Sequence, residues 1–361
     1  MNILYDHQKF STQEYGGISR YFATLIQAIK RSPEFEYQLG VLLSNNHYLQ
    51  NTDEAFHSLK KIIKNPGSIY KLNKLYNQYL LTRNRFDVFH PTYYDTYFID
   101  KLKKPLVVTI HDMTYERLPE YFWAKDPLTK LKRLNIERAD KIIAISETTK
   151  NDLIKYLNTN PDKIEVVYHG IDFETPLNVT PLKNIPEEYI LFVGHRNAYK
   201  NFFLFLYAFQ QLSIKHPDLK VILTGGGDLD IAELEFIQRL KLSDKILHIN
   251  ASDEELNYLY QQAITFVYPS LHEGFGLPIL EAFMSECPIV LSDTECFREI
   301  AQDAALYFEP QSVDDLAATL EKVINSNDLR SNLIEAGKKR IQYFPLQKSV
   351  DETFEIYKKL V

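Results

Sequence analysis

The sequence predicts an α/β protein with two doubly wound domains, each built on a mostly parallel sheet. Short β-type runs alternate with helical patterns along the chain, which is typical of successive βαβ units. A proline-containing segment with little periodicity, residues 173–186, interrupts this alternation and is the predicted linker. A length of 361 residues with 45% hydrophobic and 25% charged positions is sufficient for two domains of ordinary size.

The predicted strands form two series, one on each side of the linker. The first series is 2–6, 38–43, 88–91, 106–110, 141–145 and 165–168, and the second is 189–193, 220–224, 245–249, 264–268 and 288–291. Helices are predicted at 18–31 and after Ser146, Asn201 and Asp253, where apolar residues recur at three- and four-residue spacing. We expect domains at residues 1–175 and 186–341, with a C-terminal helix at 342–361 returning toward the first domain.

Composition narrows the classes of function. The net charge of −7 argues against a protein that grips nucleic acid over its whole surface, because such binding depends on Lys and Arg at phosphates. The N-terminus lacks the apolar stretch of about 7–15 residues of a secretory signal, and no run approaches the roughly 20 apolar residues that span a bilayer. We therefore expect a cytoplasmic protein with at most peripheral membrane contact. Cys287 and Cys296 fit no metal spacing and are expected to be buried thiols.

Two carboxylates flank a predicted helix start in residues 268–285, YPSLHEGFGLPILEAFMS. Glu273 lies in a glycine-rich turn after a strand, and Glu281 falls about one turn into the helix. The N–H groups of Gly276 and Leu277 could receive an anionic or polyhydroxyl ligand, and carboxylates accept hydrogen bonds from sugar hydroxyls. From the residues alone, acidic side chains that merely favour a helix N-terminus are an equally good explanation.

This segment resembles the signature of the retaining GT-B glycosyltransferases of family 4, in which two glutamates eight positions apart surround Gly-Phe-Gly-Leu-Pro. The similarity continues through CPIVLSDTECFREIAQDAALYFEP and covers nearly the whole chain. It implies two Rossmann-like doubly wound domains facing a cleft. It also implies that Glu273 contacts the donor sugar and Glu281 the nucleotide ribose. The implied donor contacts at the turn are Gly274, Phe275, Gly276 and Leu277.

A second cluster follows the predicted strand that ends at Gly194, in FVGHRNAYKNFFLFLYAF. Arg196 and Lys200 could stabilise a diphosphate leaving group, on which charge accumulates as the glycosidic bond breaks. A solvated surface loop is the alternative for these residues alone. The resemblance implies an arginine and a lysine on the donor pyrophosphate, and Lys200 is in the expected register. The arginine often follows the glycine directly, where this chain has His195.

The predicted first domain contributes two further candidate sites. Gly16 and Gly17 lie between the first strand and the first helix, and the resemblance implies that they reach the donor phosphate. A tight βα connection would also explain the two glycines. His111 directly follows an apolar strand, and the family has a matching His-Asp close to the transferred sugar. We expect His111 to position the sugar electrostatically, and we interpret His90 and His169 as structural histidines.

A glycine-rich segment and an acidic pair indicate whether the protein should bind a dinucleotide or a metal. Residues 225–227 lack the G-x-G-x-x-G spacing of a dinucleotide site, which argues against a dehydrogenase. Asp228 and Asp230 superficially match a metal-binding Asp-x-Asp pair, but they open a helical stretch and are expected to be N-terminal helix charges. No cofactor or metal is expected, because the two cations above would neutralise the diphosphate. The resemblance places the nucleobase near Ala251 without selecting guanine or uracil.

A basic segment from Lys60 to Arg85 contains no acidic residue. Its cations are Lys60, Lys61, Lys64, Lys71, Lys74, Arg83 and Arg85, interleaved with isoleucine, leucine and tyrosine. Such a segment is typical of surfaces that bind an anionic membrane or an anionic acceptor. A helix packed on the first domain with its lysines in water is the alternative.

These features together predict a retaining, metal-independent glycosyltransferase. It would move a sugar from a nucleoside diphosphate donor to a saccharide or lipid-linked acceptor in polysaccharide or glycolipid biosynthesis, with mannose as the first sugar to test. A GT-B sugar-nucleotide epimerase and a non-catalytic sugar-binding protein are the alternatives.

Overall fold

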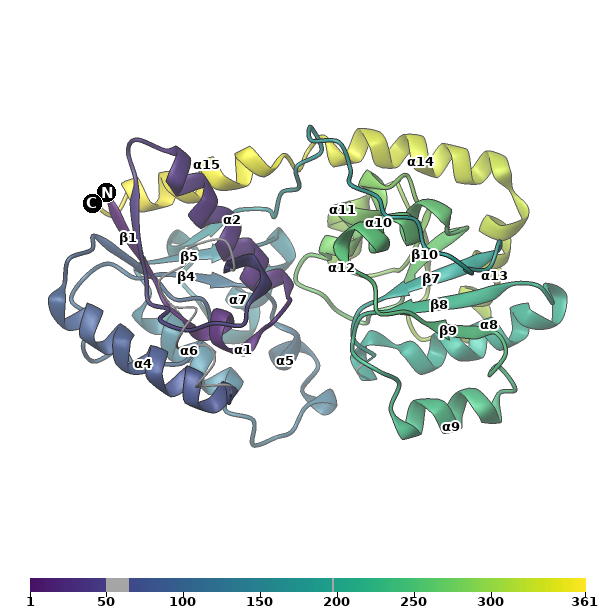
Figure 1. Cartoon of the computed structure of the whole chain (residues 1–361), viewed down its shortest axis with the longest axis horizontal. Coiled ribbons are helices and arrows are strands. Elements are labelled where there is room, and N and C mark those ends of the chain that lie inside the picture. The colour runs from purple at the N-terminus through teal and green to yellow at the C-terminus, as the bar shows by residue number, and fades with distance from the viewer. Residues whose placement is uncertain (50–64, 197) are drawn as a thin grey trace. The chain divides into compact units, whose positions relative to one another are not determined.

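The structure is a computed structural model that describes residues 1–49, 65–196 and 198–361 (Figure 1). It divides into two compact units, Met1–His169 with Gln347–Val361, and Gly170–Leu346. The first unit thus ends six residues before the predicted boundary at 175. The segment predicted as a linker is part of the second unit, because Thr180 N–H donates to the Glu254 carbonyl and the Asn257 amide donates to Asn178.

The first unit is built on parallel strands. They are β1 (Asn2–Tyr5), β2 (Glu36–Leu39), β3 (Val88–His90), β4 (Val107–Ile110), β5 (Lys141–Ala144) and β6 (Ile164–Val166). They pair in the orders β2-β1-β3 and β4-β5-β6, and a parallel bridge between Phe89 and Leu106 links the two sets. The chain therefore adds β2 on one side of β1 and then β3 on the other, which makes a topological switch point between β1 and β3.

Helices surround these strands. They are α1 (Gln8–Thr12), α2 (Gly17–Arg31), α4 (Pro66–Arg83), α5 (Thr114–Arg117), α6 (Leu128–Arg138), α7 (Glu147–Leu157) and α15 (Leu346–Lys358), with 3-10 turns η1 (His47–Leu49), η3 (Pro119–Tyr121) and η4 (Pro161–Lys163). The C-terminal helix α15 starts at Leu346, four residues after the predicted 342, and packs into the core beside α2 and β1 (Figure 1). Its Tyr357 hydroxyl is 2.9 Å from the Tyr5 hydroxyl.

The second unit has one parallel sheet in the order β12-β11-β10-β7-β8-β9. Its strands are β7 (Tyr189–Val193), β8 (Lys220–Thr224), β9 (Ile246–His248), β10 (Thr265–Tyr268), β11 (Ile289–Ser292) and β12 (Leu306–Phe308). The chain adds β8 and β9 on one side of β7 and returns to its other side with β10. The switch point of this sheet therefore lies between β7 and β10.

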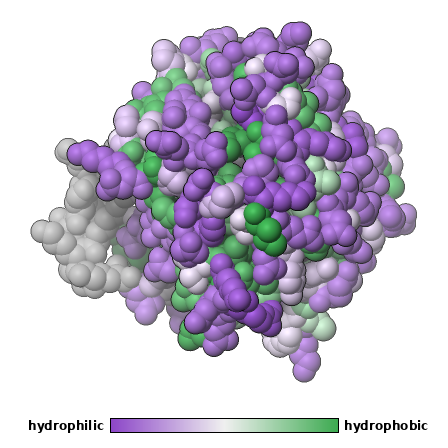
Figure 2. Space-filling view, turned by 90° about the vertical axis from the view of Figure 1, so that its right-hand side faces the viewer, coloured by the Kyte–Doolittle hydropathy of each residue, from purple (hydrophilic) through white to green (hydrophobic). Residues whose placement is uncertain are grey.

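The helices of the second unit are α8 (Phe202–Lys215), α9 (Ile231–Arg239), α10 (Asp253–Gln262), α11 (Leu277–Met284), α12 (Glu295–Ala301), α13 (Val313–Asn325) and α14 (Asn327–Ile341), with the 3-10 turn η5 (Ala198–Lys200). Apolar residues of α8, including Phe202, Phe205 and Phe209, are fully buried against the sheet. Figure 2 shows a face that is mainly hydrophilic with scattered hydrophobic residues, as expected of a solvated surface.

The predicted α/β class is confirmed, since parallel strands alternate with helices in both units. Cys287 and Cys296 are buried free thiols, as predicted. Strand β12 was not predicted: it has only three residues, it lies at the sheet edge, and Leu306 and Tyr307 are half-buried. None of the helices that the structure describes is long and apolar enough to cross a membrane.

Candidate functional site

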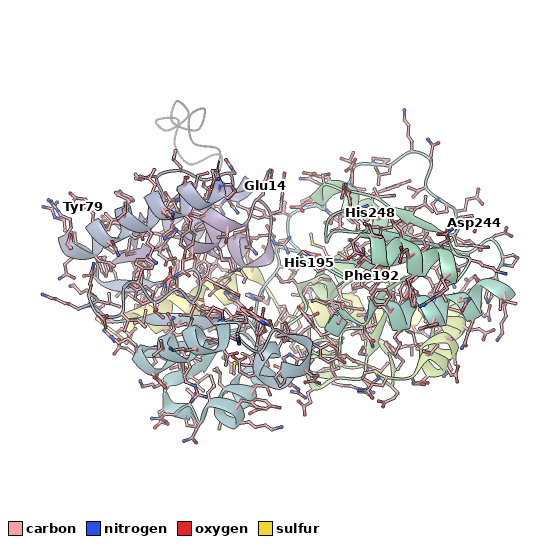
Figure 3. All side chains as sticks on the ribbon, turned by 90° about the horizontal axis from the view of Figure 1, so that it is seen from below. Glu14, Tyr79, Phe192, His195, Asp244 and His248 are labelled. Carbon is pink, nitrogen blue, oxygen red and sulfur yellow. The ribbon has the colours of Figure 1, made fainter. Side chains whose placement is uncertain are left out.

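The switch point of the second unit brings two predicted motifs together. Strands β7 and β10 are neighbours, with Val267 opposite Phe192, so the loops that follow them leave the sheet side by side. Figure 3 labels Phe192 on β7 and His195 just beyond the end of that strand. Lys200 belongs to the first of these loops and Glu273 to the second.

Lys200 and Glu273 form an ion pair at this point. The Lys200 Nζ binds Glu273 Oε1, and the two side chains are 15% and 14% exposed. The Lys200 Nζ also lies 5.1 Å and 5.6 Å from the ring centres of Tyr199 and Tyr268. The pair thus combines a cation suited to a phosphate with a carboxylate suited to sugar hydroxyls, both still accessible to solvent.

Tyr268, at the end of β10, is a candidate that the sequence interpretation did not select. Burial raises its pKa well above the ordinary value, and the charge of Glu273 and a hydrogen bond with it raise the pKa further. The phenol therefore stays protonated and helps to fix the Glu273 carboxylate. Its position as the last residue of a strand was the available sequence signal.

The turn after Glu273 needs glycine where α11 begins. Gly276 precedes the helix with φ of 93°, a left-handed value, and a Cβ there would lie 3.1 Å from Ile279 Cδ1. Leu277 then starts the helix, so the N–H groups of its first turn lie beside the ion pair. Glu281 is half-buried in the middle of this helix.

The structure leaves Gly274 and Phe275 only their backbone for ligand contact. Both residues are buried, and the Phe275 ring is 2% exposed and packs edge-on against Phe344 at 5.7 Å. The carbonyl of Phe275 accepts a hydrogen bond from Cys296 Sγ. The predicted donor contact at Phe275 is therefore not a side-chain contact, because this ring belongs to the core.

The structure differs from the prediction for Arg196. The guanidinium is buried: Nε binds Glu233 at 2.8 Å, and the remaining nitrogens donate to the carbonyls of Gly225, Gly227 and Asp228 at 2.8, 2.8 and 3.0 Å. Residues 225–227 all have φ between 74° and 77°, so Arg196 holds a loop that requires glycine. With its donors bonded to the protein, this side chain is not presented to a diphosphate.

His195 occupies the position where the family often has arginine. It is exposed, and partial burial followed by the charges of Lys200 and Arg196 lowers its pKa. At neutral pH its imidazole is therefore mainly neutral and adds little positive charge beside Lys200.

Asp228 and Asp230, which lie near the start of α9, both accept hydrogen bonds from other residues of the second unit. Asp230 caps α9 and forms a capping box with Glu233, which confirms its predicted role at a helix start. Asp228 Oδ1 instead accepts a hydrogen bond from Asn250 at 3.4 Å. The half-buried Ala251 follows Asn250 and precedes Ser252, the N-cap residue of α10. In the described ranges no three His, Cys, Asp or Glu residues are grouped as metal ligands.

Gly16 and Gly17 form the start of α2 in the first unit. Gly16 is the N-cap residue and has extended backbone with φ of 166°, so its conformation alone does not demand glycine. Space is the restriction, because a Cβ there would lie 2.6 Å from the Gln13 side chain. Gly17 is the first helical residue, so its N–H is one of the unpaired donors expected at a helix start.

His111 follows β4 and is only 9% exposed. Burial, followed by the neighbouring His169, lowers its pKa well below the ordinary value, so its imidazole is neutral at neutral pH. The rings of His111 and His169 are stacked at 6.2 Å, which makes His169 a neighbour of the candidate site. His90 has the predicted structural role, since its nitrogens bond Tyr357 at 2.7 Å and Thr109 at 2.9 Å.

Comparisons with known proteins cover both units. Glycosyltransferase Family 4 matches residues 15–175, and Glycosyl transferases group 1 matches residues 179–340. The O-antigen chain mannosyltransferase RfbU of Salmonella typhimurium is 28% identical over 217 residues, which is 60% of each chain. An N-acetylgalactosaminyltransferase of Campylobacter jejuni, named for a diacetylbacillosaminyl-diphospho-undecaprenol acceptor, is 24% identical over 91% of this chain and 92% of its own.

Solved structures show the same fold. HepE of Anabaena, in complex with UDP and glucose, has a TM-score of 0.73 at 18% identity and covers 100% of both chains. The two family matches lie on the two units, and the glutamate motif and Lys200 lie within the second match. The chain therefore belongs to the GT-B glycosyltransferases of family 4.

Proposed function

We propose that this glycosyltransferase uses a nucleoside diphosphate sugar, retains the anomeric configuration and needs no metal. The observation that carries the proposal is the Lys200–Glu273 pair at the β7–β10 switch point, next to the start of α11. A cation, a carboxylate and a helix N-terminus at one switch point match the parts of a sugar diphosphate.

In this proposal different residues of the second unit contact different parts of the donor. Lys200 and the first turn of α11 stabilise charge on the departing diphosphate, and the incoming phosphate replaces Glu273 as the partner of Lys200. Glu273 then accepts hydrogen bonds from the sugar, and Glu281 from the ribose. Arg196 contributes by holding the loop at 225–227 instead of touching the phosphate.

The first unit keeps the roles that the family resemblance implies. The N–H groups of Gly16 and Gly17 serve the donor phosphate. His111, neutral through burial, positions the transferred sugar by hydrogen bonding. The neutral state suits this role because a neutral imidazole can donate and accept at once.

The relatives set the order in which substrates are tested. The Salmonella relative is named as a mannosyltransferase, which makes mannose the first donor sugar, and the Anabaena structure with UDP and glucose makes glucose the second. The Campylobacter relative is named for a lipid-linked saccharide acceptor, which supports the same acceptor class for this enzyme in polysaccharide or glycolipid assembly.

A panel of nucleotide sugars screened for protection against heat tests the donor. A ligand at 100 times its dissociation constant adds about 2.7 kcal/mol to the free energy of unfolding. We expect a donor to protect the wild type and to protect Lys200→Met less. Transfer is then followed as glycosylated acceptor plus free nucleoside diphosphate in excess EDTA, with the anomeric configuration of the product determined.

Four results would overturn parts of this proposal. Protection without product formation would indicate a non-catalytic binding protein, and conversion of the donor sugar without transfer would indicate an epimerase. Activity lost in EDTA and restored by Mg²⁺ or Mn²⁺ would remove metal independence. An inverted product would remove retention.

We also propose that the enzyme is cytoplasmic and docks peripherally on the anionic inner face of the membrane through residues 60–85. Lys60, Lys61 and Lys64 lie outside the described residues. In α4, Leu75 and Tyr79 are 64% and 53% exposed, which supports a surface that tolerates apolar contact.

Sedimentation with anionic vesicles tests this docking. Each cation near the surface contributes about 1 kcal/mol, so salt should weaken binding. A variant with Lys60, Lys61, Lys64, Lys71 and Lys74 neutralised should bind much less. Equal sedimentation of both proteins would contradict the proposal.

A further inference from the structure

A pocket of about 370 Å³ opens in the first unit where α5, η3, α6 and the end of α7 meet. Figure 1 labels three of these elements, α5, α6 and α7, on the unit that contains His111. Its volume lies at the lower end of the range of ~300–1,000 Å³ of small-molecule sites. The residues that line it include Tyr115, Glu116, Phe122, Trp123, Asp126 and Tyr156, and we call it the Trp123 pocket.

Aromatic rings form much of its lining. Tyr115 and Phe122 stack with their ring centres 3.7 Å apart and their planes 20° apart, and Tyr156 adds another ring. Trp123 is the only tryptophan in the chain and is 70% exposed. Large flat rings left open to water at a pocket supply contact area for a ligand at low entropic cost.

Two carboxylates, together with Thr129 and Arg133, form the polar part of the pocket. The Glu116 side chain is 4% exposed, and its Oε2 is 2.8 Å from the Nζ of the buried Lys132. Its Oε1 is buried and has no hydrogen-bond partner among the described residues. Asp126, which starts α6 by accepting from Leu128 N–H at 2.9 Å, lies on the same pocket.

We propose that the Trp123 pocket binds a neutral sugar unit of the acceptor saccharide. A pyranose presents apolar C–H faces to aromatic rings and hydroxyl donors to carboxylates, which is the pairing that this lining offers. The lining also includes Arg133, so a phosphate is tested as a separate arm below, whereas the charged groups disfavour a lipid tail. The inference rests on the proposed function, because only a transferase has an acceptor.

The position of the pocket fits this role. The helix α5 begins at Thr114, three residues after His111, and Glu116 belongs to that helix. The Lys132 that holds Glu116 also donates to the carbonyl of Asp112 at 3.0 Å. One buried lysine therefore ties Glu116, a residue of the pocket lining, to the loop that carries His111.

Fluorescence of Trp123 tests binding without requiring turnover. Mannose-, glucose- and N-acetylhexosamine-containing disaccharides are titrated into the wild-type protein, with inorganic phosphate and anionic vesicles as separate arms. We expect at least one disaccharide to change the emission saturably, with no change on addition of phosphate. A response to vesicles and to none of the disaccharides would overturn the proposal in favour of a membrane contact.

Kinetics then test the pocket during transfer, with the responding disaccharide as acceptor. Trp123→Ala should raise the acceptor KM about tenfold and leave the donor KM unchanged, and Trp123→Tyr should restore most of the affinity. The matched control is Tyr343→Ala, which removes an exposed ring of the second unit and should change neither constant.

Failure of the pocket and failure of the proposed function give different results. Transfer with an unchanged acceptor KM in Trp123→Ala would overturn the pocket and leave the transferase. Heat protection by no nucleotide sugar, together with a saturable disaccharide response, would overturn the donor assignment and leave a saccharide site.

Discussion

The two units share a doubly wound topology but differ in what occupies their switch points. In the first unit Asp6, just after β1, is fully buried and accepts hydrogen bonds from the Thr92 N–H at 2.8 Å and the Tyr97 hydroxyl at 3.1 Å. In the second unit the corresponding loops hold Lys200 and Glu273, which remain partly exposed.

The difference shows that topology selects the place where a ligand can bind, but not whether that place is open. Donors from the neighbouring loop satisfy Asp6, so its charge stabilises the fold. Lys200 and Glu273 bind each other with exposed atoms remaining, so a ligand can exchange with either partner. Substitutions at the two switch points should therefore have different effects. Those at Asp6 in the first unit should change stability, and those at Lys200 or Glu273 in the second should change turnover.

The largest expected effect comes from Arg196→Met, which should lower the free energy of unfolding by about 3–5 kcal/mol because it leaves Glu233 buried without its partner. Chemical denaturation measures the loss. The control is Arg298→Met, which breaks an exposed pair with Asp293 and should cost at most about 1 kcal/mol. Unchanged stability with weakened nucleoside diphosphate binding would instead place Arg196 on the donor.

The next effect concerns turnover. Lys200→Met and Glu273→Gln should each lower kcat on the order of a hundredfold, because each removes a group that interacts with the transition state. Thermal stability should change little. Lys215→Met serves as the control, since Lys215 is exposed on α8 and pairs with Glu321 at 2.8 Å. Near-normal kcat in folded Lys200→Met would exclude Lys200 from the site.

Sequence reasoning selected both Lys200 and Glu273, which the structure brings together as an ion pair, but not the structural role of Arg196. The first selection agrees with the geometry because loops that follow neighbouring parallel strands leave the sheet at the same edge, although β8 and β9 separate β7 from β10 in the chain. The second failed because the partners of Arg196 lie 29 to 37 residues further along and share no motif with it. The position of Arg196 in a family motif does not show in which direction its guanidinium points.

The Trp123 pocket could also not be predicted from the sequence. Its lining comes from several short elements, and residues such as Tyr115, Asp126 and Tyr156 recur in no recognisable spacing. Glu116 resembles any acidic residue in a short helix until its burial and its unpaired oxygen are known. Sites assembled from tertiary contacts need coordinates, whereas sites at strand ends can be predicted from the order of the strands.

A smaller effect tests the switch point of the first unit. Asp6→Ala should lower the free energy of unfolding by about 1–3 kcal/mol, because it leaves the Thr92 N–H and the Tyr97 hydroxyl without their acceptor. Asp162→Ala, at an exposed position, is the control. Donor affinity of the folded variant should be unchanged. Loss of donor binding at full stability would show that this switch point also binds ligand.

A pH-dependent effect tests the buried histidines of the first unit. Burial lowers the pKa of His90 and His169 to about 3, and that of His111 well below its ordinary value. In the unfolded chain these histidines titrate near 6.5. The stability that they contribute is therefore fully present above pH 6.5. It is lost as pH falls toward 3, because only the unfolded chain takes up their protons.

Each such histidine should change the free energy of unfolding by ~1.4 kcal/mol per pH unit between those limits. His90→Gln removes one of them, so its stability should fall less steeply between pH 6 and pH 4 than that of the wild type. Trp123 fluorescence follows this transition, because that tryptophan belongs to the first unit. Equal slopes for the two proteins would mean that His90 is protonated in the fold, which its bonds to Thr109 and Tyr357 in a fully buried site argue against.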